Sequence, residues 1–207
     1  MINGKGFARS SSAAVLAVAL TFAPAASAGV PRTQPDQALQ QLARQLEPYK
    51  DVAYALANGY RQGSPCESHP TFGTMGHHYV NPRLLGFTAP VGGRVNGTGT
   101  YTGVEPPAIL LYAPDGQGGL KLVGIELLVF AAAWHATNKN PPKYRGREYN
   151  YMVDNPATPT IDEAHNFMPH YDLHIWLFEH NPSGLYAQWN PSPAVSCGVG
   201  HFQHVGH

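Results

Sequence analysis

The segment Pro169–His180 constrains this chain most, because as an extended strand it would have two very different faces. Side chains alternate along a strand, so every second residue points the same way. One face would carry His170, Asp172, His174, Trp176, Phe178 and His180. The other would carry Tyr171, Leu173, Ile175, Leu177 and Glu179, which is mainly apolar and typical of a core. Three imidazoles and a carboxylate beside two aromatic rings indicate that the first face belongs to a functional site.

The N-terminal part of the chain predicts a helical region over residues 33–62. Apolar residues recur there at alternating spacings of three and four, which places them on one helix face. Pro48 interrupts the pattern and removes a backbone donor, so a kink or two shorter helices are expected. Asn58-Gly59 is a stop signal. The apolar face around Leu42 and Leu46 either docks on a sheet or mediates association, and docking is the simpler interpretation.

The rest of the chain favours strands. A short strand ended by a turn is expected over 73–82, and another strand over 108–113. A longer strand over 120–133 follows the turn-forming residues 114–119. Residues 86–103 are rich in Gly and Thr and predict a loop, and 136–168 predict a long excursion. Helices followed by antiparallel strands indicate an α+β fold, with N-terminal helices packed on a curved antiparallel sheet or a partly closed β-barrel.

Residues 1–28 have the pattern of a secretory signal peptide. Lys5 and Arg9 precede a short apolar run, and Ala26-Ser27-Ala28 is a small-x-small cleavage site. The alternative is a disordered cytosolic N-terminus. The run is too short for a membrane span, and no later segment qualifies. The sequence therefore predicts a secreted or periplasmic protein, with one domain over 29–200 and a flexible His-rich tail over 201–207.

Charge and cysteine content narrow the function classes. The formal net charge is zero with histidine neutral, so nothing indicates a nucleic-acid groove. The two cysteines, Cys66 and Cys197, predict a disulfide in an exported protein. The alternative is that one or both thiolates bind a metal. A disulfide closing so long a loop would contribute roughly 4–5 kcal/mol in the chain-entropy model.

Strand geometry limits how the histidines of Pro169–His180 can share a metal. Four residues at about 3.3 Å each separate His170 from His174 by roughly 13 Å, so both cannot bind one ion directly. Asp172 and His174, about 7 Å apart, can share an ion only with favourable side-chain angles. A residue on an adjacent strand, about 5 Å away, is the easier partner.

Two partners are expected from other strands. One of His77 and His78, in the short strand expected within 73–82, must face the site. Glu126 lies in a nearly continuous apolar run, where a carboxylate is costly to bury without a cation or a donor. It is therefore either a metal ligand or a structural hydrogen-bond partner. We expect a mononuclear site of His78, or His77, with Glu126 and His174, and with His170 and Asp172 nearby.

Three such ligands and an open water position suit zinc, iron, copper or manganese, and would support hydrolytic or redox chemistry. The sequence does not determine the metal, whether the protein is an enzyme, or its oligomeric state. The competing hypothesis is a non-catalytic protein that binds a small molecule in a pocket lined by histidines and by Trp176, Phe178 and Trp189. A third is an interaction protein that displays the helix face around Leu42 and Leu46.

Four segments carry a resemblance to a family of exported bacterial proteins of unassigned function. They are Met75–Pro82, Leu122–Glu126, His170–Trp176 and Asn181–Pro191. The family patterns are Met-Gly-x-His-Tyr-x-Asn-Pro, a Val-Glu strand, His-Tyr-Asp-Leu-His-Val-Trp, and Asn-Pro-x-Gly-x-Phe-x-x-Trp-Asn-Pro with a Cys. The resemblance spans about residues 50–197. It implies that His78 rather than His77 is the motif histidine, and it matches Cys66 and Cys197 to the two cysteines of the family. The chain departs from the pattern at Tyr186, where the family has Phe.

Overall fold

The computed structural model describes residue 1, residues 36–159 and residues 162–198. Its compact unit spans Pro35–His207. The expected signal peptide over 1–28 and the His-rich tail over 201–207 lie outside the described residues, and the domain limits 29–200 stay a prediction. Within the described ranges, no helix is long and apolar enough to cross a membrane.

The helical region is shorter than the sequence predicts. It consists of α1 (Gln37–Gln45), a 3₁₀ turn η1 (Glu47–Lys50) and α2 (Val52–Ala57). Pro48 lies in the 3₁₀ turn, so the predicted interruption is confirmed. The stop predicted at Asn58-Gly59 is confirmed, because Asn58 caps α2 and Gly59 takes a φ of +87°, so the helical region does not extend to residue 62. The chain then enters a strand.

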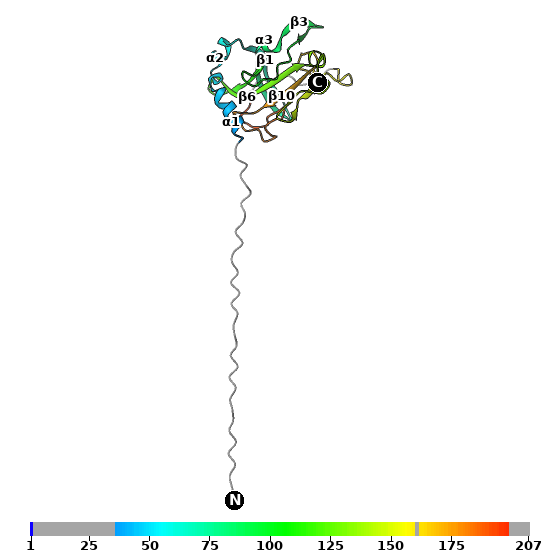
Figure 1. Ribbon diagram of the computed structural model, residues 1–207. Helices are drawn as coiled ribbons and strands as arrows, with labels where there is room; N and C mark the ends of the chain where they lie inside the picture. The colour runs from blue at the N-terminus through cyan, green and yellow to red at the C-terminus, as the bar shows by residue number, and fades with distance from the viewer. Residues whose placement is uncertain (2–35, 160–161, 199–207) are drawn as a thin grey trace. The chain divides into compact units, whose positions relative to one another are not determined.

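The protein is built on a strongly curled, six-stranded antiparallel sheet with the form of a half-barrel (Figure 1). The strand order is β1-β2-β5-β6-β10-β9. The bounds are β1 Arg61–His69, β2 Gly73–Val80, β5 Ile109–Pro114, β6 Leu120–Phe130, β9 Asn150–Met152 and β10 His170–Ile175. The mixed helix-and-strand class and the curved antiparallel sheet are thus as expected from the sequence.

Apolar side chains cover both faces of the sheet. On one face, Leu42 and Leu46 from the helical region pack with Leu110, Leu127 and Leu173. Leu42 and Leu46 are 4% and 0% exposed, so the docking interpretation is confirmed and the helix face is not displayed for a partner. The opposite face carries a second apolar cluster that includes Ile109, Leu128 and Phe130. The polar residues of β10 lie on this second face.

Several segments differ from the sequence-based expectation. β10 ends at Ile175 rather than at His180, and β6 ends at Phe130, where α4 (Ala131–His135) begins. The remaining elements are α3 Pro82–Leu85, β3 Phe87–Val91, β4 Arg94–Gly97, β7 Lys143–Tyr144 and β8 Arg147–Glu148. The expected loop over 86–103 therefore contains a hairpin, and the excursion over 136–168 supplies the edge strand β9.

A disulfide joins Cys66 on β1 to Cys197 near the end of the described chain. The two residues are 131 positions apart, and their Cα atoms lie 5.6 Å from each other. The predicted pairing is confirmed, and neither sulfur is available as a metal thiolate. The bond fixes the edge strand β1 to the C-terminal segment.

Candidate metal centre

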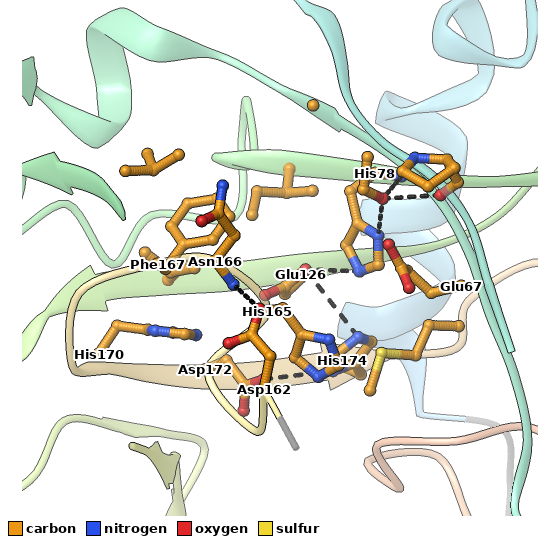
Figure 2. Close-up of a pocket in the computed structure, with 17 residues that line it drawn as sticks. Glu67, His78, Glu126, Asp162, His165, Asn166, Phe167, His170, Asp172 and His174 are labelled. Atoms are coloured by element: carbon orange, nitrogen blue, oxygen red, sulfur yellow. Dashed lines mark hydrogen bonds and ion pairs between the residues drawn. The ribbon is translucent and has the colours of Figure 1, made fainter. Parts of the chain in front are cut away.

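Three strands place His78, Glu126 and His174 on the same face of the sheet. Glu126 on β6 lies directly opposite His174 on β10 in the antiparallel register. His78 comes from β2, which is separated from β6 by β5. The curl of the sheet lets the His78 side chain cross over β5, and Figure 2 shows both imidazoles turned toward the Glu126 carboxylate.

The donor atoms of these residues form a compact cluster. One ligand atom from each lies within 4.8 Å of the other two, which is geometrically compatible with a metal site. Nε2 of His78 is 3.3 Å from Oε2 of Glu126, and Nε2 of His174 is 3.9 Å from the same oxygen. Ligands about 2.0–2.2 Å from a tetrahedral ion lie roughly 3.3–3.6 Å apart. The first distance already fits, and the second needs a shift of about half an ångström.

A hydrogen bond from β1 sets the tautomer of His78. Oγ of Ser64 lies 2.8 Å from the carbonyl oxygen of Pro65 and 2.9 Å from Nδ1 of His78. Because the hydroxyl proton is used on the Pro65 carbonyl, Oγ must accept from Nδ1–H of His78. The lone pair of His78 is then on Nε2, the nitrogen that faces Glu126.

The ring of His174 is arranged in the same sense. Its Nδ1 lies 4.0 Å from Oδ2 of Asp172, while Nε2 faces Glu126. Asn150 holds the Asp172 carboxylate by donating from Nδ2 to Oδ1 at 3.1 Å. A metal-binding imidazole usually donates from its other nitrogen to a carboxylate; Asp172 stands in that position, although 4.0 Å is too long for a hydrogen bond. Both histidines thus direct Nε2 toward the same point.

Burial shifts the pKa of every titratable group in the cluster in the direction that disfavours the charged form. Burial raises the pKa of Glu126 well above its ordinary value, and the nearby Asp172 raises it further. Desolvation lowers the pKa of His78 well below 6.5, and lowers that of His174 to about 3, with His165 adding to both shifts. The imidazoles are therefore neutral at pH 7, the form in which histidine binds a metal.

The cluster has polar atoms that the protein itself does not satisfy. Among the described residues, Oε2 of Glu126 and both ring nitrogens of His174 are buried and have no hydrogen-bond partner. A buried polar group without a partner costs about 1–3 kcal/mol. A cation between the three side chains would satisfy the carboxylate and the imidazoles together, so the donor set fits a metal ion.

The cluster opens into a pocket of about 420 Å³ on the sheet face opposite the helices. Four residues with carboxylates line it: Glu67, Glu126, Asp162 and Asp172. Four histidines line it as well: His78, His165, His170 and His174. An ion bound at the cluster would therefore have one side open to a small cavity that carries both polar and apolar side chains.

The other predicted site residues are divided between the pocket and the opposite face of the sheet. His170 and Asp172, expected near the site, line the same pocket. His77 is paired with Tyr112, its Nδ1 lies 3.2 Å from Nε2 of Gln62, and alternation directs it to the opposite face from His78. His77 is not part of the three-residue cluster.

The aromatic residues expected in the pocket do not line it. Of the described lining residues, Phe167 is the one phenylalanine, tyrosine or tryptophan, whereas Trp176, Phe178 and Trp189 are elsewhere. Trp176 is buried and stacks on His174, while Phe178 packs against the helix-facing cluster. The cause is that β10 ends at Ile175, so the alternation that placed Phe178 beside Trp176 no longer holds.

Among the polar lining residues that sequence reasoning missed are Ser64, Glu67, Asp162 and His165. Ser64 and Glu67 lie on β1, between the expected helical region and the first expected strand. Asp162 and His165 belong to the long excursion, which has no periodicity to assign a face.

The segment 162–167 covers one side of the pocket and is anchored by β4. Arg94 donates from Nη1 to the Phe167 carbonyl oxygen at 2.7 Å and from Nη2 to Oδ1 of Asp162 at 2.8 Å. Its guanidinium also pairs with Asp154. His165 and Asn166 have φ values of 50° and 64°. Two successive left-handed residues that are not glycine cost free energy, which such anchoring offsets.

Comparison of the chain with protein-family models, with curated proteins and with solved structures finds no match. The resemblance that the motifs indicate therefore stays a prediction, and the site is assigned from its own geometry.

Proposed function

We propose that this protein is an exported metal-binding protein, with one transition-metal ion held by His78, Glu126 and His174. The observation that carries the proposal is the convergence of a half-buried and two buried side chains whose ligand atoms lie within 4.8 Å of one another, where Oε2 of Glu126 lacks a hydrogen-bond donor. The disulfide and the absence of a membrane-spanning helix in the described residues are compatible with export.

Two imidazoles and one carboxylate are a donor set used by catalytic zinc sites and by non-haem iron(II) sites. Copper binds the same donors, so the ion has to be identified by metal analysis. The fourth position would face the pocket, where a bound ion lowers the pKa of a coordinated water or polarises a ligand oxygen. The arrangement thus suits a metalloenzyme as well as a binding protein.

The test is metal analysis of protein purified without an affinity tag, in full-length form and without residues 201–207. Removing the tail separates binding at the cluster from binding by its three histidines, His201, His204 and His207. We expect one ion per chain in both forms. His78→Ala and His174→Ala should lose the ion, and Glu126→Gln should weaken it by removing the anionic ligand.

His77→Ala is the matched control, since it removes the neighbouring imidazole and leaves the cluster intact. Metal content below stoichiometry in the wild type, or unchanged content in the His78→Ala and His174→Ala variants, would contradict the proposal. In that outcome, the same pocket would serve a small molecule without a metal, with Glu126 protonated and bonded to His78.

A further inference from the structure

His170 presents a hydrogen-bond acceptor at the other end of the pocket from the metal centre. Its Nδ1 lies 3.0 Å from the carbonyl oxygen of Met168, which can only accept, so the proton is on Nδ1 and the lone pair on Nε2. His170 is 3% exposed, and burial lowers its pKa to about 4, which keeps the ring neutral at pH 7. In the described structure Nε2 has no partner, and Figure 2 shows the ring directed into the pocket.

The described lining of the pocket provides hydrogen-bond acceptors but no Lys or Arg side chain. Glu67, Asp162 and Asp172 line it in addition to the metal ligand Glu126, and none of its described lining residues is Lys or Arg. Arg94, which binds Asp162, has its guanidinium occupied by two carboxylates and the Phe167 carbonyl. An anionic ligand would therefore find no cationic side chain in the described lining to pair with, and would face the lone pair of His170.

We propose that this pocket selects a small neutral or cationic molecule that donates a hydrogen bond from a hydroxyl or amino group to Nε2 of His170. The inference rests on the proposed function in one respect: a second polar atom of the small molecule would bind the metal at the opposite end of the pocket. Cα of His170 and Cα of His174 are about 13 Å apart along β10, and a pocket of about 420 Å³ accommodates a molecule of hexose size.

The test uses three hexose probes with the same ring and different charges: glucose, glucosamine and glucuronate. Each is titrated into protein with ¹⁵N-labelled histidine, in metal-free and in Zn²⁺-loaded form. The His170 signals are assigned by their loss in His170→Leu. We expect the Nδ1–H tautomer for His170, a saturable shift of its Nε2 signal with glucose and glucosamine, and affinity about tenfold or more weaker for glucuronate.

His170→Leu should weaken binding of glucose and glucosamine about tenfold, because the acceptor is removed. His180→Leu, which changes an exposed histidine that does not line the pocket, should leave both affinities unchanged. A protonated Nε2, equal or tighter binding of glucuronate, or no saturable shift with any probe would overturn the inference. A failure of the protein to bind metal would not by itself overturn the inference, because the His170 signals of the metal-free protein report on the pocket independently.

Discussion

The His174 ring should make the metal-free protein less stable than it would be with an apolar residue. His174 is 1% exposed, and neither of its nitrogens has a hydrogen-bond partner in the described structure. His174→Leu replaces the ring by a side chain of similar size without a polar atom. If the site exists to bind a metal, this substitution should stabilise the metal-free protein and remove its response to metal.

The magnitude follows from the two unsatisfied atoms. Each buried polar atom without a partner costs about 1–3 kcal/mol. The Nδ1 atom lies 4.0 Å from Asp172 and the Nε2 atom lies 3.9 Å from Glu126, so small movements recover part of this cost. We therefore expect metal-free His174→Leu to have a free energy of unfolding about 1–3 kcal/mol above that of the wild type.

The assay is equilibrium unfolding in urea of the disulfide-bonded protein, with chelator and with Zn²⁺ at 100 times the dissociation constant. At that ratio the wild type should gain about 2.7 kcal/mol from metal, whereas His174→Leu should gain nothing. His77→Leu is the control and should keep the full gain. A metal-free His174→Leu protein that is less stable than the wild type would refute the argument that the ring is unsatisfied.

Three further predictions test the surroundings of the site. Ser64→Ala should weaken metal affinity about 10- to 100-fold in chelator competition, whereas Ser64→Thr, which keeps the hydroxyl, should retain most of it; equal affinities would show that Ser64 does not fix the His78 tautomer. Replacing both Cys66 and Cys197 by Ser should lower the free energy of unfolding in urea by about 4–5 kcal/mol, and an unchanged urea midpoint would contradict this. In the folded protein the pKa of His170 is about 4 rather than 6.5, so the unfolded chain takes up the proton first as the pH falls. Relative to His170→Leu, the metal-free wild type should therefore lose about 3 kcal/mol of stability between pH 6.5 and pH 4, and a constant difference would count against a buried neutral ring.

The sequence predicted the parts of the site that depend on local pattern. Alternation along Pro169–His180 separated His170, Asp172 and His174 from the apolar face, and β10 has that alternation as far as Ile175. Glu126 stood out because a carboxylate in an apolar strand requires a partner. Both inferences use only the two-residue period of a strand and the cost of burying charge, which are properties of a short segment.

Only the tertiary structure decided which residues meet. Alternation assigns a face within one strand but does not give the register between strands, so the pairing of Glu126 with His174 and the reach of His78 across β5 were not determined in advance. β1, which lies between the expected helical region and the first expected strand, brings Ser64 to His78. The cover segment 162–167 enters the pocket because Arg94, far away in sequence, holds it there. Such contacts depend on the curl of the whole sheet, for which no local residue pattern carries the information.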